Sequence, residues 1–301
     1  MSAPPLATCV VVAFHRPHSL ARLMEGLHHP DVEVVVVNVD DDPAVAAVAG
    51  ERAMALPGNP GYAAAVNAGA RRAAAGVVVF TNDDLVVDAT SVLALAAVVS
   101  SGQADVALPR LVDGDGLTAL TVASLPTPRA LLVERMLLPD HRPAWLPEGA
   151  ARVQKWRSPV VAEEIHAGTA AIVAVDAGWL RAVPLPEAYF LYWEESDWFW
   201  QLRTAGSYCT RAPAVTATHA GGRDDVRPEK SRLMARNAVR CVRRTQGRRA
   251  AAAAWPVVVV WNLRLLVVDC LRAAAGSRPA AGRVAARAAG LRSAAAAWRE
   301  L

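Results

Sequence analysis

A buried strand that ends in two adjacent carboxylates constrains this sequence more than any other feature. Val77 to Phe80 is a run of β-branched and aromatic residues, which predicts a strand buried on both faces. The run ends at Thr81-Asn82-Asp83-Asp84. In open α/β sheets the ligand crevice lies at the carboxyl ends of the strands. Adjacent carboxylates there repel each other unless a divalent cation or a sugar hydroxyl lies between them. A polar turn is the alternative, because Asn and Asp favour turns.

Strand and helix patterns alternate around this segment. We expect strands at 8–14, 32–39, 55–56, 77–80, 106–108, 166–175, 207–211 and 214–219, and helices at 19–27, 44–52, 62–75, 90–100, 176–182 and up to 204. Ser19 is the expected cap of the first helix. This order predicts an α/β fold with a doubly wound, mostly parallel sheet. Residues 126–159 are Pro-rich and carry no strong pattern.

The glycine-rich fingerprint of dinucleotide-binding sheets is missing from the first turn, where Ala13-Phe-His-Arg-Pro17 stands instead. Residues 114–119 do spell G-x-G-x-x-A. They follow the acidic turn at Asp113 and do not open a helix after a strand, so we interpret them as a hairpin turn.

The length of 301 residues predicts one large core and an extension. We expect a catalytic domain over 1–225 and a helical, Ala- and Arg-rich extension over 226–301. The net charge is only +4, but nine basic residues gather between Arg227 and Arg249. This asymmetry indicates an anionic ligand or an anionic membrane surface. No aromatic-interleaved groove accompanies it, which argues against nucleic-acid binding.

The four cysteines lie far apart, so neither a zinc site nor a disulfide framework is expected, and a reducing cytosol fits. The N-terminal residues lack the basic-then-apolar layout of a signal peptide. The apolar run from Ala250 to Trp261 contains Pro256 and is followed by Asn262 and Arg264, so we expect it to be too short and interrupted to span a bilayer.

Glu194, Glu195 and Asp197 place three carboxylates within four residues, among Tyr192, Trp193, Trp198 and Trp200. Apolar walls raise the proton affinity of a carboxylate, which is how a general base is tuned. The indole faces also suit sugar rings. The alternative is that the acids merely complement the dipole of a helix start, which contributes a few tenths to about 1 kcal/mol.

Four further residues complete the candidate site. His219 ends a β-branched run, and with Asp84 and Asp83 as candidate co-ligands it could ligate Mn²⁺ or Mg²⁺ together with diphosphate oxygens. A structural histidine is the alternative. Asn59-x-Gly61 and Asn67 flank the start of a helix, where Gly61 permits close approach of a ligand. A helix cap explains Asn59 well and Asn67 less well.

Together these motifs resemble the family-2 glycosyltransferases with a GT-A fold, most closely the rhamnosyltransferase-like and galactofuranosyltransferase-like members. The resemblance runs in order over about 7–240. Its motifs are Val10 to Pro17, Val34 to Asp40, Asn59-Pro-Gly61 through Gly69, Thr81 to Asp84, Phe190 to Asp197 with Arg203 and Gly206, and His219.

The resemblance implies a role for each matched residue. Asp84 stands at the end of the family's D-x-D or N-x-D motif and would bind the metal with His219. Glu195 stands where the family has its catalytic base, beside Glu194 and Asp197. The nucleotide-sugar would be bound by Phe14, Arg16, Asn38, Asp40, Asn59, Gly61, Asn67, Asn82 and Asp83.

Some residues depart from the family pattern. Glu195 replaces the family's Asp at the base position and is one methylene longer. The acid that would read the nucleotide base is open among Asp40, Asp41 and Asp42, and Ala13 stands where the family usually has Thr.

The implied reaction is a single inverting displacement, in which Glu195 deprotonates an acceptor hydroxyl and a metal neutralises the diphosphate leaving group. The resemblance leans to a dTDP-rhamnose-like donor, with UDP-sugars close behind, in cell-wall or polysaccharide synthesis. The rival functions are a non-catalytic sugar-nucleotide-binding homologue and a sugar-1-phosphate nucleotidyltransferase. The latter needs a Gly-rich, Arg- and Lys-containing first loop, and His15-Arg-Pro17 is not one.

The C-terminal residues leave two interpretations open. Arg240, Arg243, Arg244, Arg248 and Arg249 precede an apolar run that holds Trp255 and Trp261. A helix packed on the catalytic core is one interpretation. The other is a peripheral contact with the inner face of a membrane, where arginines meet anionic headgroups beside a lipid-linked acceptor.

Overall fold

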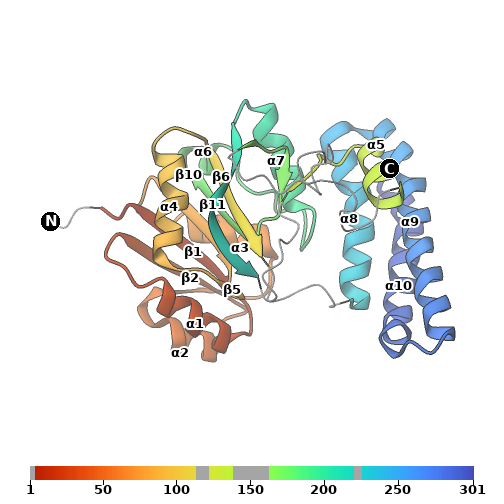
Figure 1. Ribbon diagram of the computed structural model, residues 1–301, viewed down its shortest axis with the longest axis horizontal. Helices are drawn as coiled ribbons and strands as arrows, with labels where there is room; N and C mark the ends of the chain where they lie inside the picture. Colours follow the sequence, from red (N-terminus) through yellow and green to blue (C-terminus); the bar gives the residue numbers. More distant parts are fainter. Residues whose placement is uncertain (1–3, 113–121, 138–162, 220–225) are drawn as a thin grey trace. The chain divides into compact units, whose positions relative to one another are not determined.

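The computed structural model describes residues 4–112, 122–137, 163–219 and 226–301 (Figure 1). The chain divides into two compact units. The first comprises Met1–Ala123, Glu148–Phe190 and Trp198–Gly221, and the second comprises Ser124–Pro147, Leu191–Asp197 and Gly222–Leu301. The second unit therefore includes two internal segments in addition to the expected C-terminal extension.

The first unit is built on a nine-stranded mixed sheet with the order β3-β2-β1-β4-β10-β6-β11-β5, in which β8 also pairs with β11. The strands are β1 (Ala7–Ala13), β2 (Val32–Val39), β3 (Ala53–Leu56), β4 (Val77–Asn82), β5 (Leu85–Val86), β6 (Val106–Val112), β8 (Glu163–Glu164), β10 (Ile172–Asp176) and β11 (Cys209–His219). A separate two-stranded sheet pairs β7 (Val122–Ala123) with β9 (Ala167–Gly168).

Short helices connect these strands. They are α1 (Pro17–Gly26), α2 (Pro43–Ala49) with the 3₁₀ turn η1 (Gly50–Arg52), α3 (Tyr62–Ala70), α4 (Ala89–Ser100), α6 (Ala177–Ala182) and α7 (Glu194–Thr204). The first four residues of α7 belong to the second unit and the rest to the first. The β-α alternation follows the expected order and confirms the α/β class.

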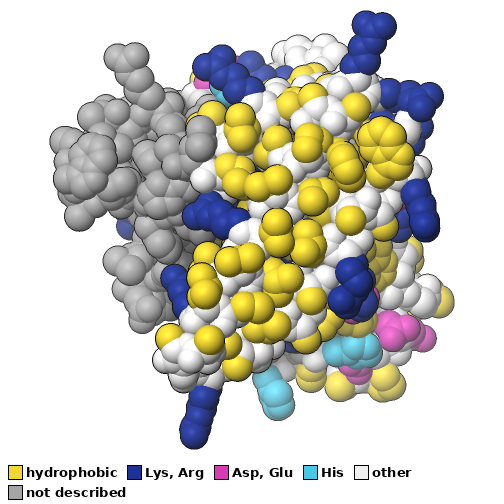
Figure 2. Space-filling view, turned by 90° about the vertical axis from the view of Figure 1, so that its right-hand side faces the viewer, with side chains coloured by type: hydrophobic (Ala, Val, Ile, Leu, Met, Phe, Trp, Pro, Cys, Tyr) yellow, Lys and Arg dark blue, Asp and Glu magenta, His cyan; other side chains and the backbone are white. Residues whose placement is uncertain are grey.

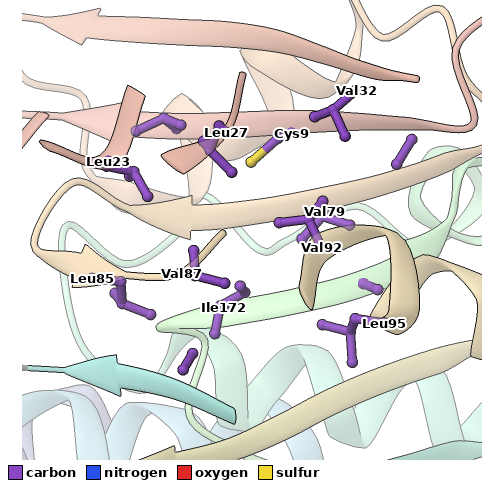
Figure 3. Packing of buried hydrophobic residues seen from close by; sticks show 14 of the residues in the cluster. Cys9, Leu23, Leu27, Val32, Val79, Leu85, Val87, Val92, Leu95 and Ile172 are labelled. Carbon is purple, nitrogen blue, oxygen red and sulfur yellow. The ribbon is translucent and has the colours of Figure 1, made fainter. Parts of the chain in front are cut away.

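The core of the first unit lies between the sheet and the helices α1 and α4, and Figure 3 shows its packing. Alternate residues of the central strands, such as Cys9 of β1 and Val79 of β4, face Leu23 of α1 and Leu95 of α4. The opposite face of the sheet is covered by α3, and Trp198 of α7 also packs there, with its ring 5.7 Å from that of Phe80. Because both faces are covered, the strands read as near-continuous apolar runs.

The second unit is helical. It contains α5 (Pro128–Leu131), the π-helical turn η2 (Leu132–Leu137), α8 (Pro228–Gln246), α9 (Arg248–Ala274), α10 (Arg278–Ala296) and the 3₁₀ turn η5 (Ala297–Glu300). In this unit α9 packs against α8, α10 and α5.

The structure corrects several expected elements. The sheet is mixed because β10 runs antiparallel to both of its neighbours, β4 and β6. Ser19 lies inside α1, whose first turn is instead set by Pro17, a residue whose fixed φ suits that position. The strands expected at 207–211 and 214–219 are one strand, β11, with a bulge between Ala212 and Thr216. The hairpin expected at 114–119 and most of the Pro-rich stretch at 126–159 lie outside the described residues.

The prediction that the C-terminal apolar run is too short and interrupted to span a bilayer was also wrong about length. Helix α9 continues through Pro256 and runs for 27 residues, so by length and composition alone it could cross a membrane. Pro256 lies on the exposed side of the helix, where water can hydrogen-bond the backbone carbonyl that the proline leaves without a donor.

Gly61 provides a direct test of how α3 is positioned. Its φ is 99°, and a Cβ added there would lie 2.2 Å from the backbone oxygen of Phe190. We expect Gly61→Ala to lower the free energy of unfolding, because the strained φ alone costs about 1–3 kcal/mol. Urea denaturation measures the loss. Gly76→Ala is the matched control, because a Cβ at Gly76 meets no atom of the described structure within 4 Å. Equal stability of the two variants would contradict this account.

Candidate functional site

The sheet register brings the ends of three strands together around Asp83 and Asp84. Strand β1 pairs with β4 in parallel, with Val12 opposite Asn82, so the loop after β1 begins beside the two aspartates. Strand β11 pairs with β5, with His219 opposite Leu85. The residue that follows Asp84 is therefore held beside His219. This places the end of the first loop and the end of β11 at the same carboxylates.

Asp84 is the centre of this cluster. Its Oδ2 accepts a hydrogen bond from Arg16 Nη1, and its Oδ1 lies 3.4 Å from His219 Nε2. Burial opposes ionisation of Asp84. The adjacent His219 and Arg16 outweigh burial and lower the pKa of the carboxyl group. Asp84 is therefore held as an anion at neutral pH.

Asp83 lies deeper and is held differently. It is buried, and its Oδ2 accepts a 3.0 Å hydrogen bond from the backbone N–H of Phe14. Burial raises its pKa to about 6, although the Phe14 N–H and the charge of Arg16, 3.9 Å away, act in the opposite direction. The two adjacent aspartates thus differ in proton affinity, with Asp84 the more acidic.

The donor set at Asp84 fits a divalent cation of the Mg²⁺ or Mn²⁺ type. Asp84 Oδ1 is buried and accepts no hydrogen bond from any residue that the structure describes, although it faces His219 Nε2. Within the described ranges, no group of three or more His, Cys, Asp or Glu side chains could hold a metal ion by itself. A cation here would need oxygens from substrate phosphates or water, which is the usual way in which enzymes bind Mg²⁺.

A second cluster lies at the end of β2. His15 Nδ1 lies 2.7 Å from Asp42 Oδ2, and His15 Nε2 lies 3.3 Å from Asp40 Oδ2. The hydrogen bond to Asp42 is the main reason why the pKa of His15 is raised, with a smaller contribution from Asp40. The same hydrogen bond lowers the pKa of Asp42. The acidic turn after β2 is therefore tied to the loop after β1.

The three candidate acids of this turn, Asp40, Asp41 and Asp42, differ in their hydrogen bonds and backbone conformation. Asp42 caps α2 through Ala44 N and is also bound through its backbone to the side chain of Asn38. Asp40 and Asp41 have φ values of 67° and 52°, which non-glycine residues adopt at a cost of about 1–3 kcal/mol. Since Asp42 is used as a cap, Asp40 and Asp41 remain the candidate acids for contact with a ligand near His15.

The residues around α3 shape the loop that precedes it. Asn59 Oδ1 accepts from Gly61 N, so Asn59 closes a turn and does not cap α3. Asn67 is buried and hydrogen-bonds to both the N–H and the carbonyl of Leu185 and to Glu187 Oε1. Through these bonds Asn67 holds the segment 185–187 in place. Asn82 and Phe14 are partly exposed next to the aspartate pair.

The acidic start of α7 belongs to the second unit. Glu194 is buried and its Oε2 has no hydrogen-bond partner among the described residues, whereas Glu195 is partly exposed. Burial, followed by the charge of Glu195, raises the pKa of Glu194, and burial also raises the pKa of Glu195. Carboxylates with raised proton affinity are suited to accept protons.

Asp197 is arranged as an anchor. It is buried, and its Oδ2 lies 2.7 Å from Arg244 Nε of α8. The ion pair with Arg244 occupies this carboxylate oxygen and ties the start of α7 to α8. Of the three acids on α7, the geometry therefore leaves Glu194 and Glu195 as candidates for proton transfer.

The turn into α7 is strained and is held by α8. Tyr192 and Trp193 have φ values of 69° and 76°. Asn237 Nδ2 donates to the carbonyls of Leu191 (2.9 Å) and Tyr192 (3.2 Å), and Trp193 Nε1 donates to Met234 O. Strained backbone of this kind persists when surrounding contacts determine it, and it gathers at functional sites.

The sequence interpretation missed the supporting residues His15, Asn237 and Arg244. Asn237 had a detectable signal, because it is a polar residue on the apolar face that Ala238, Val242 and their neighbours form on α8. The partner of Arg244 could not be identified from sequence, because Asp197 is 47 residues away along the chain.

Comparison with known proteins bears on this arrangement. Residues 8–145 match the model of glycosyl transferase family 2. No curated protein sequence matches the chain significantly. The structure resembles a mannosyltransferase from Pyrobaculum calidifontis, PcManGT, in complex with GDP-Man and Mn²⁺, with a TM-score of 0.55, 13% identity, and coverage of 98% of this chain and 87% of that one.

A second similar structure is GalNAc-T7 with UDP, GalNAc and Mn²⁺. The TM-score is 0.57 at 13% identity, and the match covers 80% of this chain but only 48% of that one. At such identities these structures show the fold, which is that of GT-A nucleotide-sugar transferases. Together with the glycosyl transferase family 2 match, they support a nucleotide-sugar glycosyltransferase.

The His15 cluster makes a pH-dependent prediction. Because the folded-state pKa of His15 is raised, its bond to Asp42 stabilises the fold at low pH, and this stabilisation is lost as the pH rises through that pKa. We expect Asp42→Asn to lower the pKa of His15 while still capping α2. NMR titration of the histidine ring measures the shift. Asp41→Asn removes a charge from the same turn and should leave the pKa of His15 nearly unchanged; equal effects of the two variants would refute the pairing.

Proposed function

We propose that this protein is an inverting family-2 glycosyltransferase that transfers a sugar from a nucleotide-diphosphate donor to an acceptor hydroxyl. The observation that carries the proposal is the cluster of Asp84, His219 and Arg16 at the carboxyl ends of the central strands, where Asp84 presents a buried oxygen without a hydrogen bond. An anionic carboxylate, an imidazole and a guanidinium suit a cation and a diphosphate together.

Asp84 and His219 are the residues that would hold Mn²⁺ or Mg²⁺. A cation bound there would neutralise charge on the diphosphate leaving group. Arg16 hydrogen-bonds to Asp84, and in the donor complex it would exchange this bond for one to a phosphate oxygen. Asp40, at the end of β2, would contact the nucleoside, while Asn38, Asn59, Gly61 and Asn67 shape the surrounding loops. Phe14, Asn82 and Asp83 complete the donor-side residues.

Glu195 is the proposed base. It would accept the proton of the acceptor hydroxyl as that oxygen attacks the anomeric carbon, in one displacement that inverts configuration. The raised pKa of Glu195 and its partial exposure support this role, and the ion pair of Asp197 with Arg244 argues against Asp197. Burial is the cause of the raised pKa of Glu195, and the charge of Glu195 in turn raises the pKa of the buried Glu194.

The donor class proposed first is a dTDP-rhamnose-like sugar, with UDP-sugars, including UDP-galactofuranose, next. The acceptor would be a glycan or glycolipid of a cell-wall or polysaccharide pathway on the cytoplasmic side. A non-catalytic sugar-nucleotide-binding homologue is the alternative. Retention of Asp84 and of the raised-pKa pair Glu194 and Glu195 favours the enzyme, because binding alone does not require a base.

Asp84→Asn tests the metal assignment. We expect it to weaken Mn²⁺ binding, measured by electron paramagnetic resonance with a nucleoside diphosphate present. We also expect it to lower donor turnover by roughly 100-fold or more, because one ligand charge is lost. Turnover is followed by nucleoside-diphosphate release from a panel of dTDP-, UDP- and GDP-sugars. Glu25→Gln, an exposed charge change on α1, is the control and should match the wild type. Normal Mn²⁺ binding by Asp84→Asn would rule out this ligand.

Glu195→Gln tests the base. We expect turnover to fall by roughly 100-fold or more while donor binding persists, because glutamine keeps the shape but not the proton affinity. Thermal stabilisation by donor and metal reports donor binding separately from turnover. The matched variant Asp197→Asn should lose stability more than chemistry, since it breaks the pair with Arg244. If Glu195→Gln turns over normally and Glu194→Gln does not, the base is Glu194.

A further inference from the structure

Helix α9 presents its large apolar side chains to solvent. Val260, Leu263, Val267 and Leu271 are 47%, 45%, 46% and 66% exposed. They follow one another at intervals of three and four residues, so they form a single stripe along the helix, which Pro256 extends toward the N-terminal end. Figure 2 views this side of the second unit and shows apolar side chains gathered over a broad area. We name Pro256, Val260, Leu263, Val267 and Leu271 the α9 stripe.

The inward side of α9 is small and polar. Its buried residues are Ala251, Ala254, Val258, Asn262 and Asp269. A helix that packs on the core of a soluble protein has the opposite pattern, with its large apolar residues inward. Only 22% of the most apolar window of α9 is buried. The large apolar side chains of α9 therefore face outward, and its small and polar side chains face inward.

Ion pairs fix this inverted orientation. Asp269 is 3% exposed, and its two oxygens lie 2.8 Å from Arg283 Nη2 and 2.9 Å from Arg287 Nε of α10. Turning α9 to bury its stripe would leave these buried charges unpaired, which costs more than a surface pair contributes. Gly290 of α10 also approaches Asn262 closely, because an added Cβ would lie 2.9 Å from Asn262 Oδ1. The Asp269 ion pairs and the close approach of Gly290 to Asn262 therefore keep the stripe on the outward side of α9.

The helices α9 and α10 and the turn η5 are rich in arginine. Between Arg248 and Arg299 the sequence holds nine arginines and one acidic residue, Asp269. Two of the nine, Arg283 and Arg287, neutralise Asp269, and the other seven are exposed. These seven are Arg248, Arg249, Arg264, Arg272, Arg278, Arg292 and Arg299. Figure 2 shows Lys and Arg side chains around the apolar area.

The positive charge of these arginines distinguishes between the possible partners of the stripe. A second copy of the chain would bring the same arginines against one another in a two-fold interface, so like charges would oppose association. A helix that crosses a bilayer would place Arg264 and the Asp269 ion pairs in the hydrocarbon region, which is costly. A bilayer surface with anionic lipid satisfies both features, because it offers acyl chains to the stripe and negative headgroups to the arginines.

We propose that the α9 stripe docks in the plane of an anionic lipid bilayer, with its apolar side chains at the acyl boundary and the flanking arginines at the headgroups. The long arginine side chains can reach the headgroup level while their methylene groups remain beside the stripe. The inference goes beyond the proposed transferase activity and does not depend on it. It assigns a lipid surface as the partner of the second unit.

Flotation of the full-length protein tests the proposal. We expect it to rise with vesicles of phosphatidylcholine and phosphatidylglycerol at low salt, to bind less at high salt, and to remain unbound with phosphatidylcholine alone. Replacing Leu263 and Val267 by Ser should weaken partitioning at least roughly tenfold. Replacing Arg248, Arg249 and Arg272 by Ser should weaken it roughly 100-fold. Circular dichroism checks that each variant keeps its helices.

Matched controls come from the first unit. Leu6→Ser with Val86→Ser removes two exposed apolar residues, and Arg22, Arg71 and Arg72 changed to Ser removes three exposed arginines. Both controls should float like the wild type. The proposal is overturned if the wild-type protein stays at the bottom with anionic vesicles, or if the stripe variants float as well as the controls. It is also overturned if light scattering shows a dimer that the stripe substitutions dissociate, since a second copy then covers the stripe. Donor turnover plays no part in these readouts, so their failure leaves the proposed activity standing.

Discussion

Charge compensation at the end of β4 is the interaction on which the candidate site depends. Asp83 and Asp84 follow a strand buried on both faces, where two adjacent carboxylates would repel each other. Two segments offset this charge: the loop after β1 binds Asp83 through the Phe14 N–H and Asp84 through Arg16, and His219 at the end of β11 faces Asp84. None of these contacts is local in sequence. They arise because β1 pairs with β4, and β11 pairs with β5.

The acidic start of α7 depends on a separate constraint. Tyr192 and Trp193 hold an unfavourable backbone conformation immediately before Glu194 and Glu195. Helix α8 offsets this cost through Asn237, which binds two carbonyls of the turn, and through Arg244, which neutralises Asp197. Arg244 of α8 thus forms an ion pair within the protein, which the net charge of the sequence does not reveal. Arg244 is a structural partner, whereas Arg248, Arg249 and Arg272 of α9 are exposed.

Much of the fold could be predicted from sequence because its strands are long apolar runs and its helices have clear periodicity. The strand at 32–39 was placed correctly, and Asp84 and His219, which the sequence predicts at one site, lie 3.4 Å apart. The antiparallel direction of β10 was not predictable, because strand direction depends on tertiary pairing and not on the local pattern. Arg16 as a partner of Asp84 and Arg244 as a partner of Asp197 were missed for the same reason. The use of Pro256 as a helix break was wrong because an exposed proline can be tolerated inside a long helix.

We expect Asp84 and His219 to bind one divalent cation together with a nucleoside diphosphate. A crystal grown with Mn²⁺ and a nucleoside diphosphate, measured near the manganese absorption edge, tests it directly. The account predicts an anomalous peak at about 2.0–2.3 Å from Asp84 Oδ1 and His219 Nε2, with diphosphate oxygens completing the coordination and Arg16 moved away from Asp84. A bound diphosphate with no anomalous peak at Asp84, and with Arg16 still hydrogen-bonded to that carboxylate, would contradict it.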